Sequence, residues 1–144
     1  MPRLTEIRTS LEVGFPEGTL PEAFAKYRGR QTRAIGSLAA FPFEDRQFDV
    51  VLMSGDAVSA TSVKEAHRVL RPEGLLFFTV DEQTKSQPGF TLPGIYSLVR
   101  CGFNITDVSR HPTWRLFSRR RRTITVCATK KNWKTLTNTY RPYV

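Results

Sequence analysis

The sequence contains little cysteine and no long apolar run. Its two cysteines, Cys101 and Cys127, have neither the spacing of metal ligands nor the number that a disulfide framework needs. We therefore expect a reducing, cytoplasmic setting. No apolar stretch approaches the roughly 18 residues that cross a membrane, so we expect no membrane span. Residues 1–6 lack the apolar core of a signal peptide.

The last quarter of the chain lacks acidic residues altogether. Up to Asp107 there are 12 Lys/Arg and 13 Asp/Glu, so the net charge of +9 belongs to the residues that follow. The basic residues of this quarter are Arg110, Arg115, Arg119, Arg120, Arg121, Arg122, Lys130, Lys131, Lys134 and Arg141. Such an uneven charge predicts a polyanionic partner, with nucleic acid as the first candidate.

The length of 144 residues with 40% hydrophobic content predicts one compact domain. We expect a domain over 1–128 and a basic tail over 129–144. Short apolar runs predict strands over 10–13, 32–38, 48–53, 74–80, 103–109 and 123–128. Capping and periodicity predict helices over 19–27, 59–70 and 93–101. Strands that alternate with helices indicate an α/β fold with a mainly parallel sheet.

The centre of the chain carries the most informative motif. FPFEDRQFDVVLM at 41–53 is followed by HRVLRPEGLLF at 67–77. This pattern resembles the central segment of class I S-adenosylmethionine-dependent methyltransferases of the small-molecule (type 11) kind. Those proteins carry a pattern like LPFxDxxFDxV followed by RVLxPGG. The resemblance implies a Rossmann-like fold, S-adenosylmethionine as the cofactor and methyl transfer as the activity.

The first strand should end in the loop that holds the cofactor. In the family this loop is an acidic residue followed by three glycines at alternate positions. Here Glu12, Gly14 and Gly18 match, whereas Pro16 replaces the middle glycine. Proline adds a ring and removes an N–H where the backbone must approach a ligand closely. The alternative interpretation is an ordinary turn from strand to helix.

The other two cofactor features of the family are altered. Residues 19–31 leave room for one helix, so the family's second strand and its ribose-binding carboxylate have no counterpart. Ser37 stands where the third strand carries an acid. We therefore expect a shortened N-terminal half, whose exposed sheet edge is covered by the N-terminus, by the tail or by a second copy of the chain.

Several polar residues of the central segment have competing interpretations. Asp49 orders the start of a strand, and Glu73 replaces the first glycine of the family's turn. Asp56 follows a strand at its carboxyl end, which makes it a candidate substrate contact, although a turn residue is the simpler interpretation. The Asn-Pro-Pro-aromatic motif of enzymes that methylate base amino groups is absent after 48–53. His67, on the apolar face of a helix, is expected to be packed rather than to act as a general base.

No catalytic residue, metal cluster or phosphate loop is identifiable from the sequence. His111 is a second substrate-side candidate. Four consecutive arginines, Arg119 to Arg122, predict a basic hairpin tip that binds phosphates, and Trp114 and Trp133 are candidates for base stacking. The alternative is a solvated turn whose arginines lie over the sheet edge.

Three functional hypotheses stay open at this point. The first is a small-molecule methyltransferase homologue with weak or lost cofactor binding. The second is a non-catalytic module that binds RNA through its basic last quarter, since a fold can persist without its activity. The third is a shortened chain whose missing segment supplied the cofactor site.

Overall fold

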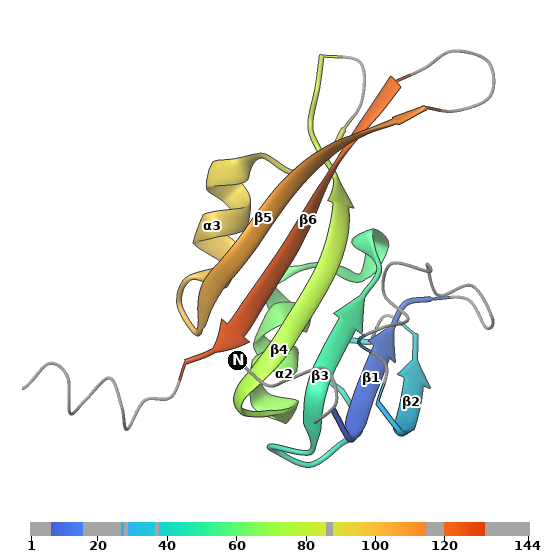
Figure 1. The fold of residues 1–144 in the computed structure, drawn as a ribbon, viewed down its shortest axis with the longest axis vertical. Coiled ribbons are helices and arrows are strands. Elements are labelled where there is room, and N and C mark those ends of the chain that lie inside the picture. Colours follow the sequence, from blue (N-terminus) through green and yellow to red (C-terminus); the bar gives the residue numbers. More distant parts are fainter. Residues whose placement is uncertain are drawn as a thin grey trace, which may run out of the picture.

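The computed structural model describes residues 7–15, 27, 29–36, 38–85, 88–114 and 120–131. Six strands form one sheet in the order β2-β1-β3-β4-β6-β5 (Figure 1). The strands are β1 (Thr9–Val13), β2 (Gln31–Ile35), β3 (Phe48–Met53), β4 (Leu70–Asp81), β5 (Phe103–Trp114) and β6 (Arg120–Lys130). The fold is therefore the Rossmann-like α/β class that the sequence predicts.

The expectation of a mainly parallel sheet is confirmed only in part. β1 pairs in parallel with β2 and β3, and β3 pairs in parallel with β4. β6 runs antiparallel to both of its neighbours, β4 and β5. The reason is the connection: parallel neighbours need a long crossover, whereas β5 and β6 follow each other directly as the two strands of a hairpin.

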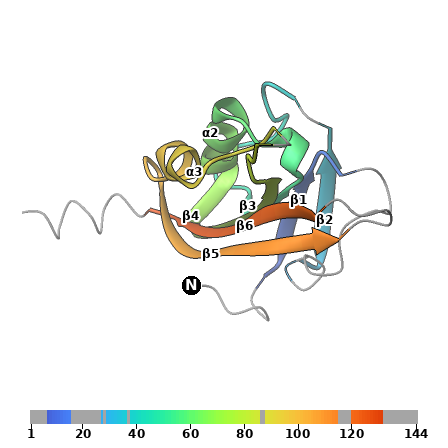
Figure 2. The same ribbon diagram turned by 90° about the horizontal axis from the view of Figure 1, so that it is seen from above.

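The described helices lie on one face of the sheet (Figure 2). They are α2 (Ala60–Val69), α3 (Leu92–Val99) and the short 3-10 turn η2 (Gly55–Ala57). Ser59 caps α2 through a capping box with Ser62, which confirms the start predicted from the sequence. Thr91 caps α3 by accepting a hydrogen bond from the backbone N–H of Gly94. The cap sets the start of α3.

Each face of the sheet has its own apolar cluster. The larger one lies under α2 and α3 and includes Met53, Phe78 and Val126. The smaller one, on the opposite face, includes Leu52 and Phe77. The ring of Tyr27 lies 4.7 Å from that of Phe77, so Tyr27 packs on the second face. The predicted helix over 19–27 lies outside the described residues apart from Tyr27.

The edge strand β2 corrects one correspondence made from the sequence. It pairs directly with β1, which is the place of the second strand in a doubly wound sheet, not that of the third. Among the described residues no strand lies beyond β2. Gln31, Arg33 and Ala34 of this strand are exposed, as expected for an edge.

Both strands of the C-terminal hairpin are longer than predicted. β5 continues to Trp114, and β6 begins at Arg120 and ends at Lys130, two residues beyond the expected end of the domain. The prediction that Arg119 to Arg122 form a hairpin tip is therefore wrong for the last three, which lie in β6. Arg119 lies outside the described residues. The ladder continues through the three arginines of β6 because each one still has a partner in β5.

Candidate functional site

The carboxyl ends of the first three strands meet at one edge of the sheet. The backbone N–H of Gly14 donates to the carbonyl of Ile35 at 2.9 Å, and that of Ser54 donates to the carbonyl of Val13 at 3.0 Å. Gly14 therefore lies between the ends of β2 and β3. Ligands of open α/β sheets bind beyond this edge, so it is the candidate functional site.

Gly14 is required here by the packing of the protein itself. Its φ of +80° is in the left-handed region, and a Cβ at this position would lie 2.6 Å from Ser54 Oγ and 2.8 Å from Ala57 Cβ. Close approach of the β1 end to η2 thus explains the glycine that the sequence suggested as a cofactor contact.

Three polar side chains near this edge differ in their surroundings. Glu12 is buried within β1, with 5% of its surface exposed. Asp56 is exposed on η2. The Oγ of Ser54 is buried and has no hydrogen-bond partner among the described atoms. Of the two predicted carboxylates, only Asp56 is therefore open to a ligand in solution.

The C-terminal hairpin reaches the same edge from the other side. Asp81, the last residue of β4, pairs with Thr123 of β6. On its other side, Thr123 pairs with His111 of β5. Trp114 and Arg120 are paired beyond the end of β4. His111, Trp114 and the arginines of β6 are thus brought to the carboxyl edge, on the side of β4.

An ion pair and a backbone hydrogen bond fasten this hairpin to the loop after β4. Nη2 of Arg110 lies 3.0 Å from Oε2 of Glu82, whose carboxylate is mostly buried. The backbone N–H of Glu82 donates to the carbonyl of Arg122 at 2.9 Å. Sequence reasoning missed Glu82 because its partner lies 28 positions away, in a strand whose end was not predicted.

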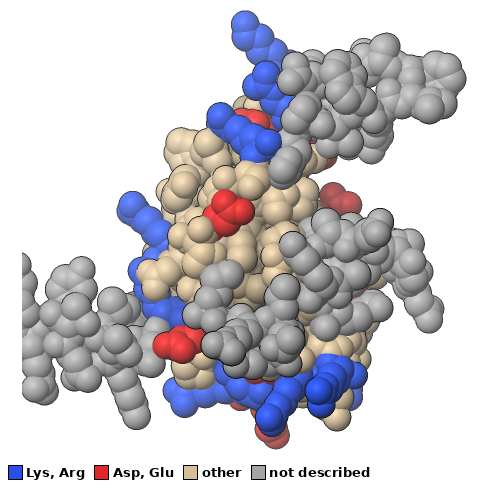
Figure 3. Space-filling model, in the orientation of Figure 1, with Lys and Arg blue, Asp and Glu red and all other residues tan. Residues whose placement is uncertain are grey.

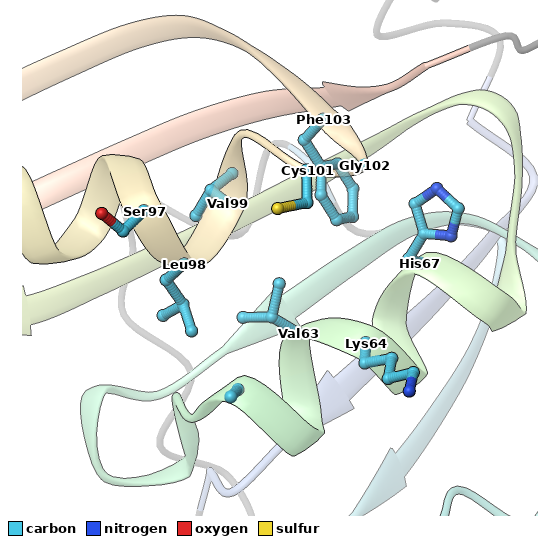
Figure 4. A pocket seen from close by; sticks show the side chains of 10 residues that line it. Val63, Lys64, His67, Ser97, Leu98, Val99, Cys101, Gly102 and Phe103 are labelled. Carbon is cyan, nitrogen blue, oxygen red and sulfur yellow. The ribbon is translucent and has the colours of Figure 1, made fainter.

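A groove of about 400 Å³ lies elsewhere, between α2 and α3 (Figure 4). Val63 and Leu98 face each other across it, and His67, Cys101 and Phe103 line the end where α2 stops. The groove lies on the helix-covered face, away from the carboxyl edge. No sequence signal indicated it, because it depends on how two helices lie side by side.

His67 has the packed position expected from the sequence. Its ring meets that of Phe103 edge-on at 5.4 Å, and its Nε2 is buried with no hydrogen-bond partner among the described atoms. Burial lowers the pKa of His67, and the charge of Lys130 lowers it further, against a hydrogen bond with the backbone of Gly102. The imidazole is therefore held neutral and structural.

Four predicted site residues, Gly18, Ser37, Arg119 and Trp133, lie outside the described residues, as does Pro16. Their assignments stay predictions. Within the part of the chain that the structure describes, no group of three or more His, Cys, Asp or Glu side chains could hold a metal ion. In the same part, no helix is long and apolar enough to cross a membrane.

Comparisons with known proteins agree with this architecture. A family model for the methyltransferase domain matches residues 16–78. The fold resembles a methyltransferase-like protein of Bacillus halodurans, at a TM-score of 0.67 and 14% identity over 88% of this chain and 93% of the other. No curated protein matches the sequence.

Two further solved structures are informative. One is the 1,6-didemethyltoxoflavin-N1-methyltransferase of Burkholderia thailandensis with bound 1,6-didemethyltoxoflavin and S-adenosylhomocysteine, at a TM-score of 0.62 and 20% identity over 90% of this chain and 73% of the other. Another is a methyltransferase-like protein of Haloferax volcanii in complex with the Trm112 methyltransferase activator, at 0.65 and 12% over 90% and 86%. At such identities the likeness establishes the fold.

The family model, over residues 16–78, and the fold agree with the resemblance of the central motif to class I S-adenosylmethionine-dependent methyltransferases. S-adenosylmethionine is the cofactor that this resemblance implies.

The described residues supply only part of what that cofactor needs. The left-handed Gly14 provides the turn at the end of β1. The strand beside it, β2, ends at Ile35 and continues into Gly36, so no carboxylate stands at the place where the family binds the ribose hydroxyls. The turn fits the cofactor and the end of β2 does not.

Proposed function

We propose that this domain is a methyltransferase homologue whose site at the carboxyl edge binds S-adenosylmethionine weakly. The observation that carries the proposal is the end of β2 in Ile35 and Gly36, beside an otherwise preserved turn at Gly14. The match to the methyltransferase domain supports the kind of cofactor. The altered edge supports low affinity and, with it, slow or absent methyl transfer.

The expected loss of affinity follows from hydrogen-bond energetics. A hydrogen bond to a charged group contributes about 1.5–3 kcal/mol, and leaving one unmade in a buried site costs a similar amount. Two such losses, at the ribose and at the proline-containing loop, move a micromolar site to about the millimolar range.

Isothermal titration with S-adenosylmethionine and S-adenosylhomocysteine tests this directly. We expect no saturable binding below about millimolar concentration. The variant Gly36→Asp places a carboxylate at the end of β2, where a new side chain meets no atom within 4 Å. It should tighten binding by about tenfold or more, the equivalent of one charged hydrogen bond. Gly36→Asn, of matched size but without the charge, should gain little.

A micromolar dissociation constant for the natural protein would contradict weak binding and restore an ordinary enzyme. If the affinity is weak but Gly36→Asp fails to improve it, the missing ribose contact is not the cause. In the active case, the residues proposed to face the methyl acceptor are Asp56 on η2 and His111 on β5. Exchange of either should then change the turnover of an acceptor without changing cofactor affinity.

A second candidate function is nucleic-acid binding through the C-terminal hairpin. The observation that favours it is the extension of β6 to Arg120, beyond the end of β4 and beside the carboxyl edge. Exchange of Arg119 to Arg122 for alanine should weaken binding to RNA and flatten its salt dependence, since each phosphate contact contributes about 0.7–0.9 to the log–log slope. Trp114→Ala or Trp133→Ala should cost about 1–3 kcal/mol if either ring stacks on a base.

The exposed β2 edge supports a partner in either case. An unpaired strand edge favours pairing with another strand. We propose a second copy of the chain as its cover, and sedimentation velocity tests this: Arg33→Pro, which blocks strand pairing at the exposed edge, should shift a dimer to monomer. The solved complex of the Haloferax volcanii protein with an activator makes a protein partner the alternative outcome.

A further inference from the structure

The edge opposite the candidate site carries a row of basic residues that the sequence scatters over distant segments. The amino ends of parallel strands meet at one edge of a sheet, and the antiparallel β6 brings its carboxyl end there too. Taken in the spatial order of the strands, each contributes one cation. The row consists of Arg30 before β2, Arg8 before β1, Arg46 before β3, Arg71 in β4, Lys130 at the end of β6 and Arg100 before β5.

Hydrogen bonds from lysine side chains to backbone carbonyls hold these segments together at what we call the amino-edge row. Nζ of Lys130 donates to the carbonyl of Leu70 at 2.7 Å, so the end of β6 lies against the start of β4. Nζ of Lys131 donates to the carbonyl of Arg100 at 2.6 Å, which places the end of α3 beside them. Figure 3 shows Lys and Arg along the lower rim of the molecule, with some Asp and Glu among them.

The charge asymmetry of the sequence therefore does not map onto one surface. Arg122 and Lys130 belong to the same basic quarter, yet they lie toward opposite ends of β6. At about 3.3 Å per residue they are roughly 26 Å apart. Lys130 instead joins arginines from residues 1–107, a segment whose net charge is close to zero.

Among the described residues, most cations of the row have no ion-pair partner, although the exposed Glu44, Asp45 and Glu73 lie in the same segments. Asp49 pairs with Arg71, and Asp45 pairs with Arg68, which lies behind the row. Among the described residues no ion pair involves Arg8, Arg30, Arg46 or Arg100. Burial lowers the pKa of Lys130 and the nearby charge of Arg46 lowers it further, with only Asp45 opposing them. Like charges are thus held close together without full neutralisation.

The chemistry of the row selects the kind of partner. The exposed large apolar side chains of the described residues are Leu38 and Tyr96, and neither lies in the row. A protein interface needs an apolar core, and a peripheral membrane surface needs apolar anchors. Single-stranded nucleic acid needs aromatic rings for stacking. The guanidinium group of arginine forms bidentate hydrogen bonds with phosphate oxygens. Binding to a phosphate backbone therefore requires neither contacts with the bases nor an apolar core.

We propose that the amino-edge row binds the phosphate backbone of double-stranded nucleic acid without reading its sequence. Six strands at about 4.8 Å spacing give the row a length of about 24 Å. A duplex presents one phosphate charge per about 1.7 Å along its axis, so several phosphates lie within reach. The surface is separate from the carboxyl edge, and its function does not depend on cofactor binding.

The test measures binding of the full chain to a labelled 20-base-pair duplex of mixed sequence by fluorescence anisotropy, over a range of salt concentrations. One variant removes four unpaired cations of the row: Arg8→Gln, Arg30→Gln, Arg46→Asn and Arg100→Gln. Asparagine is chosen at Arg46 because φ there is +57°, a conformation that asparagine tolerates. A matched variant removes the same number of charges from the hairpin by exchanging Arg119 to Arg122 for glutamine.

We expect the amino-edge variant to lose at least tenfold in affinity at 0.1 M salt and to reduce the log–log salt slope by about two to four, since each duplex contact contributes about 0.9. The hairpin variant should lose less, and thermal melting should show both variants folded. Equal losses in the two variants, or a larger loss in the hairpin variant, would overturn the proposal. So would a natural protein that binds anionic phosphatidylserine vesicles but not the duplex, or that binds neither.

Discussion

Asp49 and Arg71 form an ion pair with 2.8 Å between Oδ1 and Nη1, which joins β3 to the irregular start of β4. The other carboxylate oxygen of Asp49 accepts hydrogen bonds from the backbone N–H groups of Arg8 and Thr9 at the start of β1. Burial raises the pKa of Asp49, but these hydrogen bonds and the charge of Arg71 outweigh it and hold the pKa below its usual value. The structural role predicted for this acid of the central motif is confirmed.

Asp49→Ala should therefore destabilise the protein by about 2–3 kcal/mol, because it leaves two backbone donors of β1 without their charged acceptor. Arg71→Gln, which removes only the exposed partner of the ion pair, should cost less than about 1 kcal/mol. Urea unfolding followed by circular dichroism measures both. Equal costs would show that the ion pair, and not the backbone hydrogen bonds, carries the interaction.

Glu73 occupies a left-handed backbone position with φ of +66°, in the turn where the family has glycine. Holding a non-glycine residue there costs about 1–2 kcal/mol, and glycine costs about 0.5–1 kcal/mol in the unfolded chain. Glu73→Gly should thus raise the free energy of unfolding by up to about 1 kcal/mol, whereas Glu73→Ala should bring no gain. A lower melting temperature for the glycine variant than for the alanine variant would contradict this strain.

The sequence predicts the parts of the fold that depend on local pattern. β3 lies where the continuous apolar run predicts a strand, and α2 lies where apolar residues at spacings of three and four predict a helix. The central motif predicts the class of fold because it describes a strand, a helix and a strand that are consecutive in the chain. The ends of β5 and β6 were not predictable, since their ladder continues through arginines and threonines that have no apolar alternation.

The parts of the site that depend on tertiary position could not be predicted. Gly14 was interpreted as a cofactor contact, but its nearest constraint is Ser54, 40 positions further along the chain. The division of the basic residues between two edges follows from the direction of β6, which charge counting along the sequence does not contain. Matching Gly36 to the family's third strand also failed, because only strand pairing shows that β2 lies beside β1.

Gly14 and Gly36 give a matched pair of substitutions at the candidate site. Gly14→Ala should destabilise the protein by about 1–3 kcal/mol, because a left-handed backbone and contacts under 3 Å with Ser54 and Ala57 both oppose a Cβ. Gly36→Ala should have little effect, since no atom lies within 4 Å of its Cβ position and its φ is not in that region. Chemical unfolding of both variants measures this difference. If Gly14→Ala is as stable as the natural protein, η2 moves aside freely to accept the added Cβ.

His67 should make the stability of the domain depend on pH. Its pKa is lowered from the ordinary 6.5, first by burial and then by Lys130. The unfolded chain therefore takes up this proton at a higher pH than the folded chain does. The contribution of His67 to the free energy of unfolding should therefore be greatest above about pH 6.5 and should decrease as the pH falls below that value.

The two histidines of the chain provide the control for this dependence. His67→Gln should flatten the change in unfolding free energy between pH 7.5 and 5.5, measured by urea unfolding at each pH, because glutamine does not titrate. His111→Gln should leave the decline in place. If the natural protein is equally stable at both pH values, the ring is protonated within the fold. The groove beside Phe103 and Cys101 must then admit enough water to solvate the charge.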